Sequence, residues 1–581
     1  MKRIAVVDNK KLKDLQQKKH IQSLCPVNRA GTECIGIEKD GKLTIDEITC
    51  IGCGICVKAA PEAIKIINLP EILDKAPIHR YGENKFALFS LPTPLFGRVV
   101  GILGVNGIGK STSIQILAGI LKPNLGQDKE TSYEDMISFF KGTEMQLFFE
   151  KAKKKKIKIS YKPQQIELIA KTHKGKVMEL LKKVDEKDKL DIIAEELDLK
   201  NILNNDIDKL SGGELQRVAI AATVLKNGNL CIFDEPSSYL DIKQRINVSK
   251  FIKSLANEST SVMVVEHDLI IFDYISELAH IMYGSEDVYG AVSGVKPTKN
   301  AINVYLSGYL KEENIRFRDK QVKFEERKPF VKKQGLEMIS WDSLAKKLGN
   351  FSLKTGRGSI GKGEVIGILG ENGIGKTTFV KLLAGEIKND SGTLNENVEV
   401  SYKPQYLEAT EELVMAFLKD AINNHTNQLI NPLNIKPLYL KKLNELSGGE
   451  LQRVMVANCL GKDADLYLLD EPSAYLDVEQ RLIVSKVIRD FMELKGSSVL
   501  IVDHDLLFLD YLSDKLMVFD GIPAKSGIVT GPFAMEEGMN IFLKKLNITL
   551  RRDKESLMPR VNKPDSKLDR EQKDKGKYYY G

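Results

Sequence analysis

Five short motifs occur twice along the chain in the same order, and this internal repeat restricts the possible folds more than any other sequence feature. The paired segments are GILGVNGIGKST (101–112) and GILGENGIGKTT (367–378), YKPQ (161–164) and YKPQ (402–405), LSGGELQRV (210–218) and LSGGELQRV (446–454), IFDEPSSYLD (232–241) and LLDEPSAYLD (468–477), and VVEHDL (264–269) and IVDHDL (501–506). We therefore predict two tandem copies of one domain.

The size and composition of the chain predict several globular units. Its 581 residues exceed what one hydrophobic core holds, and 42% hydrophobic with 28% charged residues is an ordinary globular balance. The longest apolar runs, at 99–105 and 261–265, are far shorter than the roughly 20 residues of a membrane span. The start of the chain lacks the pattern of a secretory signal. A cytoplasmic protein without a membrane span is therefore predicted.

Each copy opens with a glycine-rich loop between an apolar strand and a helical pattern. Residues 104–111 and 370–377 match G-x-x-x-x-G-K-S/T, whose backbone amides surround phosphates and whose lysine reaches the β and γ phosphates. The hydroxyl after the lysine, on Ser111 or Thr377, is a magnesium ligand. The residues predicted to bind ATP here are Gly104, Asn106, Gly107, Gly109, Lys110, Ser111, Thr112, Gly370, Asn372, Gly373, Gly375, Lys376, Thr377 and Thr378.

Acidic residues end the apolar strand of each DEP motif. Asp234 and Asp470 are placed to hold magnesium through water. The next residue, Glu235 or Glu471, can orient or deprotonate the attacking water. Each residue alone would more often be structural, but the same order in both copies favours a catalytic role. The further candidates are Gln164 and Gln405, for magnesium and the water, and His267 and His504, for the γ phosphate.

The LSGGE segments are typical of ATP-binding cassettes, the ABC family, which both copies resemble. Amides at a helix start and the helix dipole suit a γ phosphate. In that family the segment faces the opposite cassette, so the resemblance implies two composite sites that ATP closes and hydrolysis releases. Asp241 and Asp477 are expected to communicate between these sites. Site one combines Lys110, Ser111, Gln164, Glu235 and His267 with Ser447 and Gly449, and site two combines Lys376, Thr377, Gln405, Glu471 and His504 with Ser211 and Gly213.

An aromatic side chain upstream of each phosphate loop is expected to stack on adenine. Tyr81 and Phe86 are the candidates in copy one. Trp341 and Phe351 are the candidates in copy two, although a core position also suits either residue.

Copy one has about 25 more residues than copy two between its phosphate loop and YKPQ. Within 132–156, apolar residues recur at three- and four-residue spacing on either side of Gly142. A helix-turn-helix insertion with a basic end is therefore predicted, whose apolar residues are Met136, Phe139, Phe140, Met145, Phe148 and Phe149.

Segments outside the repeated motifs are similar to one family, subfamily E of the ABC ATPases, the ribosome-recycling factors also called RNase L inhibitor proteins. These segments are RIAVVD (3–8), CPVNRAG (25–31), INVYLSGYLKEENIRFRD (302–319), NITLRRD (547–553) and RVNKPDSKLDREQKDKGKYYY (560–580). The resemblance implies a monomer that binds the small ribosomal subunit. With a release factor or its stalled-ribosome relative present, it would split ribosomes by ATP-driven closure.

The resemblance also implies contacts to ribosomal RNA from the insertion and from two hinge segments, at about 300–330 and 531–553. Basic residues there can neutralise phosphates without reading sequence. The alternative for these basic residues is a solvated face. The alternatives for the function of the whole chain are a ribosome-bound factor without splitting activity and a cassette pair that drives a separate membrane transporter. The basic residues are Lys153, Lys154, Lys155, Lys156, Arg316, Arg318, Arg551 and Arg552.

Five of the seven cysteines lie in the first tenth of the chain, which indicates metal chemistry rather than disulfides. CIGCGIC (50–56) is the three-ligand run of a bacterial-type ferredoxin, and the CP pair at 25–26 resembles the fourth-ligand dipeptide of another run. The run at 50–56 has Ala60 where its fourth cysteine belongs. With the spacing of family E, the cysteines missing from both runs fall at Leu12, Gln17, Ile21 and Ala60.

In two-cluster ferredoxins the fourth cysteine of each run serves the other cluster, so the missing set is the whole ligand set of one cluster. Family members carry two clusters, and one is predicted to be lost here, with Leu12 and Ile21 filling its space. Cys34 is expected to be a buried thiol, and Cys231 and Cys459 to lie in cores. Zinc on the surviving cysteines is the alternative. The predicted ligands of a single 4Fe-4S cluster are Cys25, Cys50, Cys53 and Cys56.

The predicted fold is α/β: two tandem ABC-type P-loop nucleotide-binding domains with an N-terminal ferredoxin-like α+β iron-sulfur domain and a hinge region. The iron-sulfur domain would act as a rigid lever, as the resemblance implies. The tail from Lys554 onward lacks apolar periodicity and is expected to run as an extended segment or to stay mobile. The predicted units are 1–72 (iron-sulfur domain), 73–298 (first cassette), 299–333 (first hinge), 334–530 (second cassette) and 531–581 (second hinge and tail).

Overall fold

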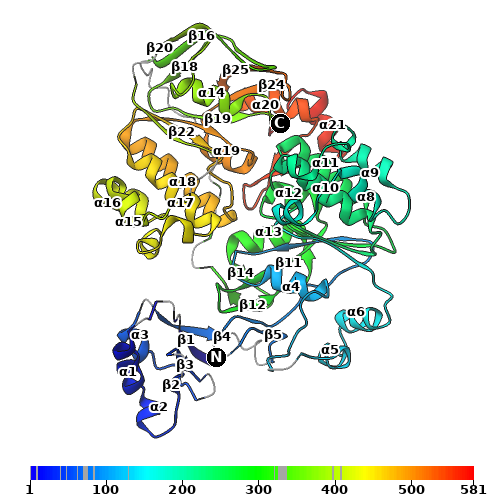
Figure 1. Cartoon of the computed structure of the whole chain (residues 1–581), viewed down its shortest axis with the longest axis vertical. Coiled ribbons are helices and arrows are strands. Elements are labelled where there is room, and N and C mark those ends of the chain that lie inside the picture. The colour runs from blue at the N-terminus through cyan, green and yellow to red at the C-terminus, as the bar shows by residue number, and fades with distance from the viewer. Residues whose placement is uncertain are drawn as a thin grey trace.

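Two large α/β units and a smaller N-terminal unit make up the computed structural model (Figure 1). No helix in the described part of the chain is long and apolar enough to cross a bilayer. The predicted boundaries at 72/73 and 333/334 lie outside the described residues. The structure describes residues 2–7, 9, 11–12, 14–38, 41–46, 49–61, 63–69, 76–82, 85–127, 130–318, 321–322, 324, 337–395, 398–405 and 409–580.

The N-terminal unit contains two antiparallel strand pairs and three helices. The pairs are β1 (Lys2–Val7) with β4 (Ile64–Leu69), and β2 (Ile35–Ile37) with β3 (Leu43–Ile45). The helices are α1 (Leu15–Leu24), α2 (Pro26–Arg29) and α3 (Ile55–Ala59). Side chains from the strands and helices, including Ala5, Leu43 and Ile64, form one small apolar core. The unit is therefore α+β.

A nine-stranded sheet forms the first cassette, in the order β5-β6-β12-β11-β7-β10-β9-β8, with β13 beside β11. Its strands are β5 (His79–Arg80), β6 (Ala87–Leu88), β7 (Val99–Leu103), β8 (Ile159–Lys162), β9 (Leu230–Asp234), β10 (Ser261–Val265), β11 (Leu278–Ser285), β12 (Tyr289–Val292) and β13 (Lys296–Pro297). The strands from β11 to β8 in this order are parallel, and β7, β9 and β10 are buried along their whole length, as in sheets covered on both faces. The helices are α4 (Lys110–Leu117), α7 (Glu167–Thr172), α8 (Val177–Lys182), α9 (Leu190–Glu196), α10 (Gly212–Leu225), α11 (Ile242–Ser254) and α12 (Leu269–Ile275).

The second cassette repeats this plan around a ten-stranded sheet, in the order β18-β16-β17-β25-β24-β19-β23-β22-β21, with β20 beside β16. Its strands are β16 (Glu337–Leu348), β17 (Phe351–Thr355), β18 (Gly358–Gly361), β19 (Val365–Leu369), β20 (Ser391–Asn395), β21 (Val400–Lys403), β22 (Leu466–Asp470), β23 (Ser498–Val502), β24 (Lys515–Ile522) and β25 (Ser526–Ala534). The helices are α14 (Lys376–Leu383), α15 (Val414–Phe417), α16 (Lys419–His425), α17 (Gly448–Gly461), α18 (Val478–Lys495) and α19 (Leu506–Leu512). Because both central sheets have the same strand order, the predicted tandem α/β cassettes are confirmed.

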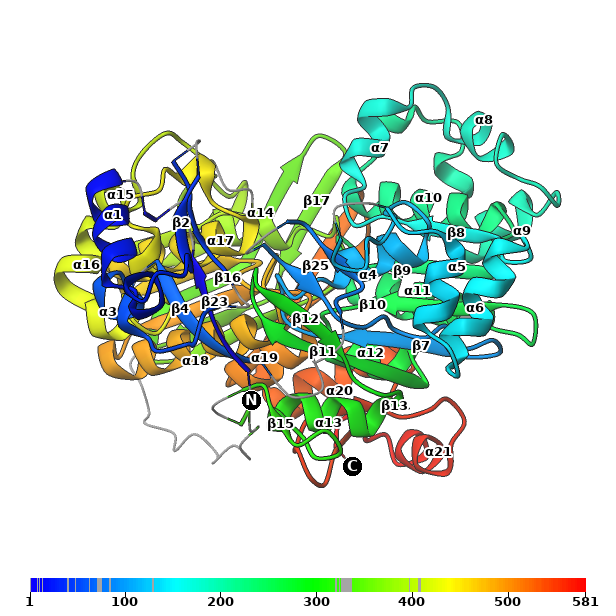
Figure 2. The same cartoon turned by 90° about the horizontal axis from the view of Figure 1, so that it is seen from below.

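The insertion in the first cassette is a helical hairpin, as its spacing predicted. It consists of α5 (Tyr133–Phe139) and α6 (Glu144–Lys153), which lie together at the edge of the cassette (Figure 2). Phe148 and Phe149 are buried, and the rings of Phe140 and Phe149 stack with centroids 5.5 Å apart. The lysines at 154–156 follow α6 and are exposed. The insertion therefore packs by its apolar face and presents its basic end to solvent.

The hinge segments and the tail form short elements against both cassettes. They are α13 (Thr298–Ser307), β14 (Tyr309–Leu310), β15 (Ile315–Arg316), α20 (Met535–Leu546), β26 (Leu550–Arg552), β27 (Pro559–Val561) and α21 (Lys567–Asp574). The expectation of an extended or mobile tail is wrong, because β27 pairs with β26, α21 is helical and Tyr579 is buried. Polar contacts hold this segment, and apolar periodicity does not detect them.

Three of the arginines expected to contact RNA are used inside the protein. Arg318 donates to the Tyr305 carbonyl and pairs with Glu479, and only 8% of its side chain is exposed. Arg551 donates to the Val561 carbonyl, and Arg552 lies over the ring of Tyr580. All three arginines therefore have partners within the chain, and their contacts with RNA phosphates stay predictions. The exposed candidates are Lys153, which pairs with Glu134, and Lys154, Lys155, Lys156 and Arg316.

Candidate functional site

The two phosphate loops connect the central strands β7 and β19 to the helices α4 and α14. Lys110 Nζ donates to the carbonyls of Gly104 and Val105 at 2.8 and 2.7 Å, and Lys376 Nζ makes the equivalent contacts with Gly370 and Glu371 at 3.0 and 2.7 Å. Burial lowers the pKa of both lysines to about 8, and the nearby acidic side chains oppose this shift. Each lysine therefore lies within its loop, next to carboxylates.

The glycine before each lysine is required by both its backbone and its surroundings. Gly109 and Gly375 have φ of 88° and 95°, a region that only glycine enters readily. A Cβ atom on Gly109 would lie 2.5 Å from the Phe86 ring, and one on Gly375 would lie 2.7 Å from the Phe351 ring. Phe86 and Phe351 therefore occupy equivalent positions in the two cassettes.

Among the four adenine candidates, Tyr81 is exposed and close to the first phosphate loop. Its hydroxyl is 3.2 Å from Thr112 Oγ1, and its ring centroid is 6.5 Å from that of Phe86. Trp341 is 2% exposed and packs edge-on against Phe379 in the core of the second cassette. The adenine assignment of Trp341 is therefore wrong, because its ring is used in the core.

A glutamine, a glutamate and a histidine meet behind each phosphate loop. In site one, Gln164 Nε2 donates to Glu235 Oε1 at 2.7 Å, and His267 Nε2 is 3.5 Å from the same oxygen. Gln405, Glu471 and His504 repeat this arrangement in site two, at 2.7 and 3.7 Å. The structure brings together, in each half, the three side chains that the motifs assigned to the attacking water, the magnesium ion or the γ phosphate.

The candidate magnesium ligands also lie together in site two. Thr377 Oγ1 donates to Asp470 Oδ2 at 2.8 Å, so a hydroxyl and a carboxylate are adjacent, as a hard cation requires. In site one, Ser111 and Asp234 form no hydrogen bond with each other within the described chain. Burial raises the pKa of Asp234 and of Asp470, and neighbouring lysines partly offset this.

The two histidines are buried and neutral. Burial lowers the pKa of His267 and His504 well below the ordinary value, and Lys110 and Lys376 lower it further. Neither ring nitrogen of either histidine has a hydrogen-bond partner among the described residues. Buried polar atoms without partners are rare, so this arrangement fits a ligand such as a γ phosphate.

Sequence reasoning missed the residues that hold the backbone around Glu235 and Glu471. Glu235 and Glu471 have φ of 48° and 50°, which is strained for a side chain of this kind. The carbonyl of Glu235 accepts from Gln216 Nε2 at 2.7 Å, and buried Lys162 donates to the Asp234 carbonyl at 2.8 Å. Gln452 and Lys403 do the same in the second cassette, at 2.6 and 2.8 Å. Their identity in both copies of YKPQ and LSGGELQRV was the available signal.

The perturbed glutamates predict a pH dependence of hydrolysis. Burial, together with the adjacent Asp234 or Asp470, raises the pKa of Glu235 and Glu471 to about 7. A base with this pKa loses its acceptor form as the pH falls, so we expect turnover to drop about ten-fold between pH 8 and pH 6. Initial rates of phosphate release across this range test the prediction. A flat profile would contradict it.

The signature segments begin helices α10 and α17, each with a capping box. Ser211 accepts from Glu214 N, and Ser447 accepts from Glu450 N. Gly213 lies against the Tyr239 carbonyl, where a Cβ would come within 3.1 Å. In the described chain, neither serine is hydrogen-bonded to the opposite phosphate loop, so their assignment to composite sites stays a prediction.

The two halves nevertheless touch at site two. Asp241 Oδ2 accepts from the backbone amide of Asn372 at 3.0 Å, which links the SYLD motif of the first cassette to the phosphate loop of the second. Arg245 Nη1 donates to the His504 carbonyl at 3.3 Å. Helices α12 and α19, which follow the two histidines, pack against each other.

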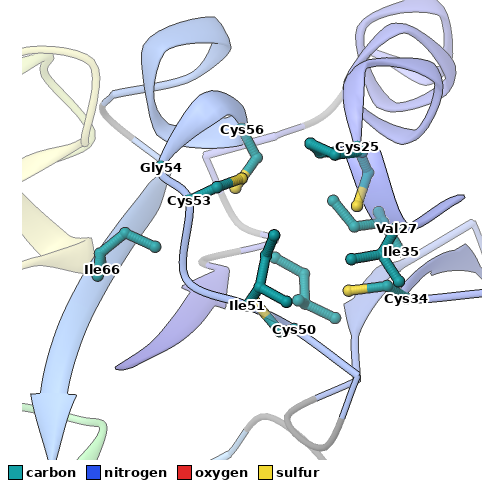
Figure 3. Close-up of a pocket in the computed structure, with 12 residues that line it drawn as sticks. Cys25, Val27, Cys34, Ile35, Cys50, Ile51, Cys53, Gly54, Cys56 and Ile66 are labelled. Atoms are coloured by element: carbon teal, nitrogen blue, oxygen red, sulfur yellow. The ribbon is translucent and has the colours of Figure 1, made fainter. Parts of the chain in front are cut away.

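Five thiols line a cavity in the N-terminal unit. The cavity encloses about 330 Å³, part of it open to solvent, and Figure 3 shows the sulfurs of Cys25, Cys34 and Cys56 directed toward it. Its other lining side chains are apolar, including Val27 and Ile35. Soft thiolates in an apolar setting suit an iron-sulfur cluster. The five cysteines are Cys25, Cys34, Cys50, Cys53 and Cys56.

Among the described residues no three His, Cys, Asp or Glu side chains are close enough to hold one metal ion. Thiolates are ligands of both iron-sulfur clusters and zinc. The 4Fe-4S assignment and the zinc alternative therefore both stay predictions.

None of the four residues at the positions of the missing cysteines lines this cavity. Leu12, Ile21 and Ala60 are 1%, 0% and 4% exposed and belong to the apolar core, while Gln17 is exposed. Leu12 and Ile21 are core residues, and the idea that they fill the space of a lost second cluster stays a prediction. Cys34 is buried as predicted, but it borders the cavity, and no ferredoxin spacing signalled that position.

These features define the class: a twin-cassette ATPase of the ABC type. A family model described as "ABC transporter" matches residues 95–238 and 353–474.

The particular family follows from matches along the whole chain. "Translation initiation factor RLI1" of Saccharomyces cerevisiae is 43% identical, over 100% of this chain and 98% of the relative. The solved complex of archaeal ribosomal stalk protein aP1 and archaeal ribosome recycling factor aABCE1 matches at 51% identity with a TM-score of 0.83, over 87% of this chain and 99% of that chain. A structure of ribosome-bound archaeal Pelota and ABCE1 matches at 49% identity with a TM-score of 0.92, over 100% of this chain and 99% of that chain. The chain belongs to this family, subfamily E of the ABC proteins.

Proposed function

We propose that this protein is an ATP-driven ribosome recycling factor that splits ribosomes into subunits after termination or stalling. The observation that carries the proposal is the full-length similarity to a chain from a ribosome-bound structure with Pelota. The relative crystallised with a ribosomal stalk protein is itself described as a ribosome recycling factor. Two complete sets of ATP-site residues, one in each half, supply the chemistry for a closing and opening cycle.

In this cycle ATP binds between a phosphate loop and the opposite signature helix. Lys110 or Lys376 holds the β and γ phosphates, and Glu235 or Glu471 orients the attacking water and accepts its proton. Magnesium, when bound, neutralises phosphate charge, and Ser111 with Asp234 or Thr377 with Asp470 would hold it. Hydrolysis removes the γ phosphate that joins the two halves, so the halves separate again.

The N-terminal unit would transmit closure to a release factor or its stalled-ribosome relative. Cys25, Cys50, Cys53 and Cys56 would hold one 4Fe-4S cluster, which when bound crosslinks the segments around the cavity. The exposed lysines at 154–156 and Arg316 would neutralise phosphates of ribosomal RNA.

The cluster assignment predicts a metal content. Protein purified without oxygen is expected to contain about four irons and four acid-labile sulfides per chain, because one ligand set survives. Replacing Cys56 by serine should remove most of this iron, whereas Cys34→Ser should retain it. Iron and sulfide assays, together with electron paramagnetic resonance of the reduced protein, measure both. About eight irons, or zinc in their place, would contradict the assignment.

A splitting assay tests the function. Purified ribosomes of the source organism are incubated with the protein, a release factor or its relative, and ATP, and then sedimented through a sucrose gradient. Free subunits with ATP and intact ribosomes with ADP are the expected result.

The yeast relative's description as a translation initiation factor favours a second function, binding to the small subunit without splitting. Ribosomes that stay intact while the protein binds isolated small subunits in a separate sedimentation run would support that function and contradict recycling.

A further inference from the structure

The first turn of α11 contacts site two through three side chains. Besides the contacts of Asp241 and Arg245 described above, Lys243 Nζ lies 2.9 Å from Glu371 Oε1, inside the second phosphate loop. Arg245 is anchored in its own half by Asp268, at 2.9 Å. A single turn of the first cassette therefore contacts the second cassette's phosphate loop and the backbone beside its histidine.

The repeat does not provide the same ion pair at site one. Aligning SYLDIKQR (238–245) with AYLDVEQR (474–481) places Glu479 at the position of Lys243. Aligning the phosphate loops places Val105 at the position of Glu371. Glu479 instead pairs with Arg318 at 3.2 Å. Site one therefore has a carboxylate and an apolar side chain where site two has opposite charges.

The side chains beside the two phosphate loops also differ between the sites. Glu286 lies against Gly107 at site one, whereas Pro523 and Ala524 lie against the equivalent Gly373 at site two. Burial raises the pKa of Glu286, and Asp477 of the other half raises it further, partly offset by an arginine. Acidic and basic side chains of the second cassette therefore both act on Glu286 at site one. At site two the charges of Lys243 and Glu371 attract each other directly.

We propose that the Lys243–Glu371 ion pair is a latch that holds site two closed around its nucleotide more firmly than site one. The inference rests on the proposed ATP-driven closure and assigns specific residues to an inequality between the two sites. Both side chains are partly exposed, 52% for Lys243 and 37% for Glu371, so the latch is moderate in strength and sensitive to salt.

The test measures how long each site retains ATP. Glu235→Gln and Glu471→Gln together stop hydrolysis, and Lys110→Ala or Lys376→Ala then leaves only site two or only site one loaded. Labelled ATP is bound with magnesium and chased with unlabelled ATP, and its release is followed. In the chain loaded at site two, Lys243→Glu and Glu371→Lys should each shorten the retention half-life about five-fold or more. The combined charge swap should restore it to within about two-fold, because the attraction is re-formed.

Matched variants separate the latch from a general effect. Lys243→Glu should leave the half-life at site one within about two-fold, and Lys243→Met should abolish the salt dependence at site two. Val105→Glu with Glu479→Lys should lengthen retention at site one by installing the pair there. Unchanged retention in the single variants, or a charge swap that fails to restore it, would overturn the latch. A parent chain that retains ATP at neither site would overturn both the latch and the proposed closure, whereas the first outcomes leave the proposed function intact.

Discussion

Replacing Glu471 by glutamine is expected to lower ATP turnover at site two by about 10²–10⁴-fold, the usual contribution of a positioned general base. Glutamine keeps the size of the side chain and can still accept from Gln405 Nε2, which is 2.7 Å from Glu471 Oε1. It cannot accept the proton of the attacking water. Glu235→Gln should have the same effect at site one, and the double variant should release almost no phosphate. Single-turnover hydrolysis and steady-state phosphate release measure these losses.

The double variant also separates closure from hydrolysis. If closure splits the ribosome, this variant should still split it once with ATP and then stay bound to the small subunit, since opening requires hydrolysis. Glu258→Gln, at an exposed surface position, serves as the control and should change neither activity. Turnover by the double variant above about a tenth of that of the natural chain would contradict the assignment of both glutamates.

Most of the two ATP sites could be predicted from the sequence because each motif fixes a strand end or a helix start. Glu235 directly follows β9, and YKPQ begins on the neighbouring strand β8, so Gln164 and Glu235 had to meet at one edge of the sheet. Contacts between motifs of different halves were harder to predict from the sequence. The pair of Lys243 and Glu371 depends on how the cassettes face each other, which no spacing within one copy determines.

The two wrong expectations have different physical causes. Trp341 was a candidate because it is aromatic and precedes a phosphate loop, but whether such a ring faces a nucleotide or a core depends on the packing of β16 against Phe379. The tail was expected to be extended or mobile because it has few apolar residues. Buried hydrogen bonds order the tail, such as the one that Thr549 Oγ1 donates to Asp569 Oδ1 at 2.6 Å. The pattern of hydrophobic residues does not predict such bonds.

The strongest of these polar contacts are made by Arg560, whose side chain is fully buried. It donates to Asp273 of α12 at 2.6 Å and to Asn303 of α13 at 3.0 Å, and it lies 3.2 Å from Asp553. Burial raises the pKa of Asp553, but backbone amides and Arg560 reverse this and hold it well below the ordinary value. The tail also contacts the second cassette, where the Tyr579 hydroxyl donates to Asp510 of α19. The tail therefore connects α12 and α19, the helices that follow His267 and His504.

Arg560→Met is expected to weaken docking of the tail by about 3–5 kcal/mol, because it removes the buried cation that Asp273 and Asp553 share. Where cleavage reports the population of the undocked state, this loss makes trypsin cut the exposed lysines of the tail at least a hundred-fold faster, and the melting temperature of the chain falls.

Arg570→Met removes an exposed arginine from α21 of the same tail and should change stability by less than about 0.5 kcal/mol. The two variants lose the same charge and differ only in burial and partners, so comparing them isolates the ion-pair cluster. Equal cleavage rates in both would show that the tail is held by its apolar contacts around Tyr579 and Met558 rather than by Arg560. The predicted difference, by contrast, would make one buried guanidinium the main link between the tail and the first cassette.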